Sequence, residues 1–176
     1  MLTDISFETY LRSLSASFDD QCHLKSFNNF TRTVADLIIN THCSNKITVF
    51  CGNGGSAADA QHWSAELMCR YELANRLPLR AISLSTDTSF ITACSNDYDY
   101  SSIFSRQISA LHPSIGLVIG LSTSGKSPNI LNALATASNL SVTTVLLTGT
   151  GCPYPSFVDH FITFPSSNTA LIQTYT

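Results

Sequence analysis

Charged side chains are scarce in this sequence of 176 residues. Only 12% of the residues are Asp, Glu, Lys or Arg, and the formal net charge is −3. A protein that binds nucleic acid needs a basic patch, so this balance argues against a nucleic-acid partner. The low charge also indicates a surface that is partly covered by other copies of the chain.

Long apolar runs are missing as well. The longest are about five residues, whereas a membrane-spanning helix needs about 18 or more. The first ten residues, MLTDISFETY, contain an early acidic residue and no apolar segment. We therefore expect neither a membrane association nor a signal peptide.

Cysteine pairs with the spacing of a metal or redox motif are also absent. There is no C-x-x-C, and the spacings fit no zinc-finger pattern. The sequence therefore predicts reduced thiols in a cytoplasmic protein. The six cysteines are Cys22, Cys43, Cys51, Cys69, Cys94 and Cys152.

Apolar residues recur at helical spacing near the N-terminus, which predicts two amphipathic helices within residues 1–45. The first set is Phe7, Leu11, Leu14 and Phe18, and the second is Phe27, Phe30, Val34 and Leu37.

Short apolar segments then alternate with helical patterns. Strands are expected at 46–51, 80–85 and 157–165, and a strand that runs into a turn is expected at 115–125 and again at 141–150. Helices are expected from about Ser56, over 101–111 and from Pro128. This alternation predicts an α/β fold, a three-layer α/β/α sandwich with a central parallel sheet, preceded by the two helices. The length favours one domain with its α/β core at 46–165, and the tail 166–176 is expected to be too short for another full helix.

The turn GNGGS, residues 52–56, follows the first expected strand. Ligands of open parallel sheets bind beyond the carboxyl ends of strands, and glycines let backbone amides approach an anion. Ser56 is expected to cap the next helix, with Asp59 three residues on. An anion site and an ordinary strand–helix turn both remain open here, but the glycine spacing fits neither a dinucleotide fingerprint nor a Walker loop.

The loop STSGKS, residues 122–127, has the same position after another expected strand. Its four hydroxyls, glycine and lysine suit the oxygens of a phosphate monoester, which we favour over a plain hydroxyl-rich loop. The loop LTGTG, 147–151, is less polar and is interpreted as structural.

His62 and Glu66 lie one turn apart on the expected helix, on one face. Such a pair can bind a metal, supply a general base, or simply form an exposed contact. In the polar stretch 86–100, Asp87, Asn96 and Asp97 can hydrogen-bond sugar hydroxyls or act as turn residues. The residue chemistry alone leaves these alternatives open.

Three segments together resemble the sugar isomerase (SIS) domain family and, within it, the phosphoheptose isomerases. They are CGNGGSAADAQHWSAEL, DTSFITACSNDYDYSSIFSRQ and GLSTSGKSPNI, and the resemblance extends to about Gln173. It implies a flavodoxin-like SIS fold, a homotetramer with active sites between subunits, and one zinc ion per subunit. It also implies conversion of sedoheptulose 7-phosphate to D-glycero-D-manno-heptose 7-phosphate, in heptose biosynthesis for lipopolysaccharide or capsule.

The resemblance also implies roles for individual residues. Glu66 would be the base that moves a proton between C1 and C2, and zinc would be held by His62, Glu66 and Gln173. The phosphate would be bound by Ser122, Thr123, Ser124 and Ser127. The other substrate contacts would come from Asn53, Gly54, Gly55, Ser56, Glu66, Arg70, Asn96, Asp97 and Gln173.

The sequence departs from the family at its C-terminal end. Family members continue beyond Gln173 into a helix with a glutamate directly after the glutamine and a histidine two turns on, whereas Thr174 follows Gln173 here. Leu171 stands where the family has arginine. Either this is a truncated copy of an isomerase, or its activity is impaired. The alternative is a non-catalytic SIS protein that binds sugar phosphates or a replication initiator.

Overall fold

The computed structural model describes residues 7–18 and 21–175, and its contacts divide the chain into two compact units, residues 1–36 and 37–176. The first unit holds α1, Phe7–Phe18, and most of α2, Gln21–Cys43. Both helices expected from the apolar spacing are therefore present. Phe7, Phe27 and the other residues of their apolar stripes lie within the bounds of α1 and α2.

The second unit is built on a five-stranded parallel sheet in the order β2-β1-β3-β4-β5. This is the strand order of flavodoxin-like folds. All five expected strands form. They are β1, Ile47–Gly52; β2, Ala81–Ser83; β3, Ile115–Leu121; β4, Thr143–Thr148; and β5, His160–Thr163.

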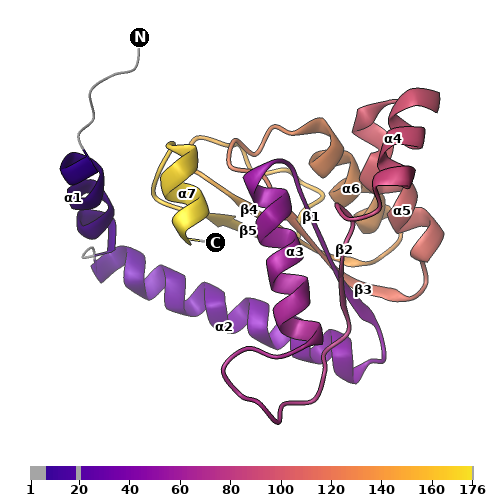
Figure 1. The fold of residues 1–176 in the computed structure, drawn as a ribbon, viewed down its shortest axis with the longest axis horizontal. Coiled ribbons are helices and arrows are strands. Elements are labelled where there is room, and N and C mark those ends of the chain that lie inside the picture. The colour runs from indigo at the N-terminus through magenta and orange to yellow at the C-terminus, as the bar shows by residue number, and fades with distance from the viewer. Residues whose placement is uncertain (1–6, 19–20, 176) are drawn as a thin grey trace. The chain divides into compact units, whose positions relative to one another are not determined.

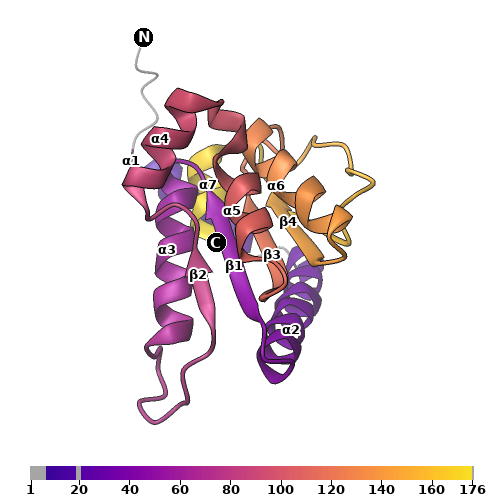
Figure 2. The same ribbon diagram turned by 90° about the vertical axis from the view of Figure 1, so that its right-hand side faces the viewer.

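Helices cover both faces of this sheet, as Figures 1 and 2 show. α3 lies on one face, and α5 and α6 lie on the other. The expected three-layer sandwich is confirmed. The helices of this unit are α3, Gly55–Met68; α4, Thr88–Asp97; the 3₁₀ turn η1, Tyr100–Ser102; α5, Ile103–Leu111; α6, Pro128–Asn139; and α7, Thr169–Tyr175.

Side chains of β1 point alternately to the two faces of the sheet and pack against the helices on both. Val49 and Cys51 are fully buried in the core cluster that includes residues of α5 and α6. Phe50, between them, meets Trp63 of α3 edge to face, with ring centroids 5.8 Å apart. Successive strand side chains point to opposite faces, so a strand buried on both faces is a continuous apolar run rather than an alternating one.

The structure contains two helices that the sequence did not predict. The polar stretch 86–100 contains helix α4, whose first turn is capped by the Asp87 carboxylate accepting from the Phe90 amide at 2.9 Å. The tail also forms a helix, α7, because Asn168 Oδ1 accepts from the Ala170 amide and Ile172 is buried. Among the described residues, no helix is long and apolar enough to span a bilayer.

Candidate functional site

Three loops leave the sheet at the same edge. Gly52, the last residue of β1, pairs in register with Leu121 of β3, which in turn pairs with Leu147 of β4. Because the strands are parallel, the turns after them begin at one level, beyond the carboxyl ends. The expected site loops are therefore neighbours in space.

The turn after β1 is tight. A β-carbon on Gly52 would lie 2.2 Å from the main-chain oxygen of Ser56, so only glycine fits there. Gly54 has φ +56 and is the N-cap of α3, without a side-chain hydrogen bond. Ser56 is a buried residue inside the helix, which corrects the expectation that it caps α3. With no side chain as its cap, the N-terminus of α3 suits an anion.

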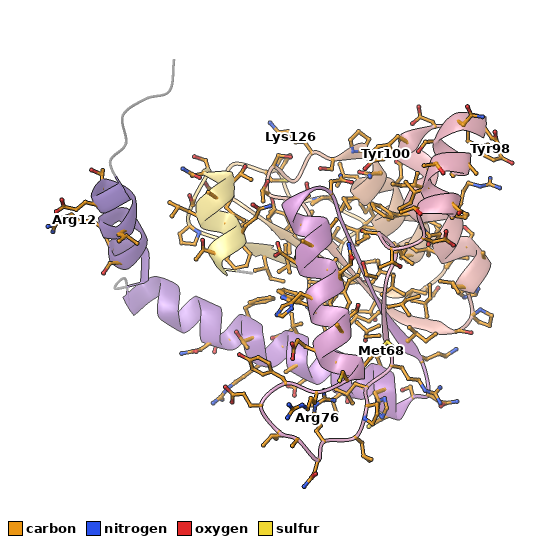
Figure 3. The ribbon with its side chains drawn as sticks, in the orientation of Figure 1. Arg12, Met68, Arg76, Tyr98, Tyr100 and Lys126 are labelled. Carbon is orange, nitrogen blue, oxygen red and sulfur yellow. The ribbon has the colours of Figure 1, made fainter. Side chains whose placement is uncertain are left out.

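The loop after β3 is held by its own hydroxyls. Ser122 Oγ lies 2.9 Å from Ser127 Oγ, and the Lys126 amide donates to Ser124 Oγ at 3.2 Å. Gly125, at φ +63, closes the turn by donating its amide to the Ser122 carbonyl. Ser127 is the N-cap of α6 and Pro128 lies in the first turn, as expected. Lys126 is exposed and extends away from the protein in Figure 3.

The loop after β4 supports the loop after β3. The Gly149 amide donates to the Thr123 carbonyl at 3.0 Å, and the Cys152 thiol donates to the Gly125 carbonyl at 3.4 Å. A β-carbon on Gly125 would lie 2.1 Å from Cys152 Sγ. These contacts agree with the prediction that the loop after β4 has a structural role. The contact of Cys152 with Gly125 was not predicted from the sequence.

A side-chain network joins the first two loops. Asn53 and Asn129 exchange two amide hydrogen bonds of 2.9 and 2.8 Å, and the Tyr100 hydroxyl donates to Asn53 Oδ1 at 3.0 Å. Asn129 and Tyr100 were not among the expected site residues. The position of Asn129, two residues after the hydroxyl loop, was the signal in the sequence; nothing comparable marked Tyr100.

Helix α7 lies against the starts of these loops. The Gln173 amide packs on Gly55, Ile172 is buried against Gly149, and Thr169 Oγ1 lies 3.4 Å from Thr123 Oγ1. The structure therefore brings Gln173 to the expected substrate turn.

His62 and Glu66 lie farther along α3. They are seven and eleven residues beyond Gly55, close to two and three whole helical turns, so they lie on the same face of α3 as Gly55. Along the helix axis they are about 10 and 16 Å from Gly55. His62 is exposed and Glu66 is half-buried. Among the described residues, no group of three or more His, Cys, Asp or Glu is placed to hold a metal ion.

The remaining candidates are at the surface. α3 ends at Met68, so exposed Arg70 lies beyond the helix that carries Glu66. Asn96 and Asp97 are the exposed last residues of α4, and the Asn96 amide donates to Asp97 Oδ1 at 2.8 Å.

Comparison with known proteins gives a consistent result. The SIS domain family matches residues 12–149. A phosphoheptose isomerase of Syntrophotalea carbinolica is 41% identical over 174 residues, which is 98% of this chain and 87% of that protein. One from Maridesulfovibrio salexigens is 43% identical over 153 residues, 84% of this chain and 73% of that protein.

Solved structures agree with this result. A phosphoheptose isomerase from Francisella tularensis superimposes with a TM-score of 0.85 at 30% identity, covering 95% of this chain and 88% of that one. The enzyme from Neisseria gonorrhoeae gives 0.82 at 32% identity, over 95% and 90%.

Proposed function

The chain belongs to the SIS domain family and is similar to its phosphoheptose isomerases, and on this basis we propose its reaction. The protein would isomerise sedoheptulose 7-phosphate to D-glycero-D-manno-heptose 7-phosphate. The observation that carries the proposal is the pair of loops Asn53–Ser56 and Ser122–Ser127, joined at one edge of the sheet. The product suits heptose biosynthesis for lipopolysaccharide or capsule. The intact loops and Glu66 favour an enzyme over a non-catalytic binding protein.

The loop Ser122–Ser127 is proposed to bind the phosphate. The loop carries the hydroxyls of Ser122, Thr123, Ser124 and Ser127 and leads directly into the N-terminus of α6, where amide donors and the helix dipole favour an anion. Asn53, Gly54, Gly55 and Ser56 would hold the sugar, and Gln173 lies against the same turn. Firm binding at both ends of the substrate orients its reacting carbons.

Glu66 is proposed as the base of the reaction. Its carboxylate would remove a proton from C1 of the ketose to give an enediol, and return a proton to C2 while the hydroxyl proton moves from O1 to O2. Positioned acid–base groups of this kind contribute about 100- to 10,000-fold in rate.

The position of Glu66 supports a site shared between copies of the chain. Glu66 lies about 16 Å along α3 from Gly55, whereas the hydroxyl loop lies beside the start of that helix. A Glu66 from a second copy would reach the loops if subunits pack across α3. We therefore propose a homo-oligomer, a tetramer, with exposed Leu73 and Leu77 after α3 as apolar surface for contacts.

Zinc suits the chemistry of His62, Glu66 and Gln173 but not their arrangement in one copy. Zinc bonds are about 2 Å long, and Gln173 packs on Gly55, about 16 Å along α3 from Glu66. These two residues of one copy cannot hold the same ion as arranged here, so a zinc site with both ligands would need Glu66 from a second copy, and no step above is routed through a metal. Metal analysis of the purified protein tests the zinc proposal directly.

The test of function is turnover of sedoheptulose 7-phosphate, followed by formation of the aldose. We expect the protein to turn the ketose over and Glu66→Gln to lose at least about 100-fold in kcat. Glu72→Gln, an exposed carboxylate six residues on, is the matched control and should keep full activity. Absence of turnover by the unmodified protein, or full activity of Glu66→Gln, would overturn the proposal. We also place the protein in the cytoplasm, where its thiols remain reduced.

A further inference from the structure

Asn129 is the buried member of the network that joins the two loops. Its residue is 1% exposed, and it is the second residue of α6, two positions after the hydroxyl loop's last residue, Ser127. Asn53, its partner, belongs to the turn after β1. A buried amide is costly unless its donors and acceptors are paired, so this position has strict requirements.

The direction of every hydrogen bond in the network is determined. The main-chain amide of Ile130 can only donate, and it donates to Asn129 Oδ1 at 3.0 Å. Asn129 Oδ1 therefore faces the Asn53 Nδ2 donor, and Asn129 Nδ2 donates back to Asn53 Oδ1. The Tyr100 hydroxyl must then donate to Asn53 Oδ1 as well.

This geometry fixes one loop relative to the other. The amide pair attaches the turn 53–56 to the N-terminus of α6, and Ser127 at that N-terminus contacts Ser122 across the hydroxyl loop. Asn132, one turn later on α6, donates to the Ser101 carbonyl in η1, so Tyr100 is anchored to the same helix. A displacement of α6 would therefore change the distance between the turn 53–56 and the hydroxyl loop.

We propose that Asn129 is a positioning residue that sets the spacing between the sugar-binding turn and the phosphate-binding loop. The inference rests on the proposed isomerase function. Asn129 does not contact the substrate but acts through Asn53 and Tyr100. Its side-chain amide holds the two loops in place only while it both donates a hydrogen bond to Asn53 and accepts one from it.

Asn129→Asp is the decisive variant because it keeps the shape and removes one donor. The new carboxylate oxygen would face Asn53 Oδ1, an acceptor, so the ionised form repels its partner. Protonation of the introduced carboxylate restores a donor at that position. We expect kcat/KM to fall at least tenfold at pH 8, and the ratio of variant to unmodified protein to rise as the pH is lowered to 5.5.

Three further variants complete the test. Asn129→Ala should lose activity equally at both pH values, and Tyr100→Phe should lose a smaller amount. Asn139→Asp makes the same chemical change at the exposed last residue of α6, outside the network, and should retain its activity. Thermal unfolding of each variant confirms that it is folded under the assay conditions.

The outcomes separate this inference from the proposed function. No turnover by the unmodified protein overturns the function. Turnover by the unmodified protein with a pH-independent activity ratio for Asn129→Asp, or with Asn129→Ala within twofold of it, overturns the positioning role alone. A ratio that rises toward acid pH for Asn129→Asp but not for Asn139→Asp supports it.

Discussion

The side-chain amide of Gln173 occupies the space that a β-carbon on Gly55 would fill. Such a β-carbon would lie 2.2 Å from Nε2, 2.7 Å from Cδ and 2.9 Å from Oε1 of Gln173. The contact joins two segments that are more than a hundred positions apart in the sequence. It places Gln173, which is proposed to contact the substrate, directly over the first turn of α3.

Gly55→Ala should therefore displace Gln173 rather than the helix. The end of a glutamine side chain moves easily, and alanine at a compatible helix position gains about 0.4–1 kcal/mol over glycine. We expect little change in the free energy of unfolding but a loss of kcat/KM similar to that of Gln173→Ala.

Combining the two substitutions tests the same contact. If Gly55→Ala acts through Gln173, the double variant should be no less active than Gln173→Ala alone. Additive losses in a double-mutant cycle would contradict this. So would a large drop in melting temperature for Gly55→Ala, because that would mean that α3 itself moves.

Gly125→Ala should disrupt the hydroxyl loop by crowding as well as by backbone strain. The added β-carbon would meet Cys152 Sγ at 2.1 Å and Thr148 Oγ1 at 2.8 Å, at a residue with φ +63. We expect a loss in the free energy of unfolding of at least about 2 kcal/mol from the combined effects.

Gly151→Ala is the matched control, since Gly151 has φ +83 but open space around its β-position. Strain alone should cost it about 1 kcal/mol. Urea unfolding of both variants measures the difference. Equal losses would show that Cys152 does not confine the loop.

The sequence was sufficient to predict the strands and their order of appearance, because each is a short apolar run that ends at a polar turn. It also located both loops at the sheet edge. It did not predict α4, because the polar run around Asp87 looks like a loop until Phe90, Ile91 and Cys94 are seen to pack together on the core. The expected Ser56 cap was wrong because the N-cap position is taken by Gly54, which has no side-chain acceptor, and Ser56 lies inside the helix.

The candidate site was predicted less completely than the fold. Residues within one motif, such as Ser122 and Ser127, can be recognised from composition and spacing. The pairing of Asn53 with Asn129, 76 positions apart, depends on the sheet register and cannot be derived from local pattern. The same applies to Gln173 and Gly55.

Arg76 should stabilise the end of the helix that carries Glu66. Its guanidinium donates to the main-chain oxygens of Glu66 at 2.6 Å, Leu67 at 3.0 Å and Leu77 at 2.7 Å, within the loop after α3 seen in Figure 3. A cation at a helix C-terminus that also satisfies its carbonyls is favourable.

We expect Arg76→Ala to cost about 1–2 kcal/mol in unfolding free energy and to speed hydrogen exchange in residues 67–80. Arg32→Ala removes an exposed charge from α2 and should change neither quantity. Unchanged exchange in that loop for Arg76→Ala would show that the guanidinium does not hold it.

Cys51 should be inert in the native protein and should make stability fall at alkaline pH. Burial raises the pKa of this thiol from 9.0 to about 12. The unfolded thiol therefore ionises first, so this contribution to stability is complete below about pH 9 and is lost as the pH rises toward 12.

Two measurements check the Cys51 prediction. Iodoacetamide at pH 8 should label the exposed Cys43 and Cys69 but not Cys51 until the protein unfolds. Cys51→Ala should show a smaller decline in unfolding free energy between pH 9 and 11 than the unmodified protein. Rapid native labelling of Cys51, or the same decline in both proteins, would argue against its burial.

The lengths of the strands have a consequence for how copies of this chain can meet. The two edge strands, β2 and β5, have three and four residues, whereas the strands between them have six or seven. Short edges offer few unpaired main-chain groups to an incoming strand, which protects a sheet from edge-to-edge aggregation. We therefore expect contacts between copies in the proposed oligomer to use helices and loops rather than to extend the sheet from one copy to the next.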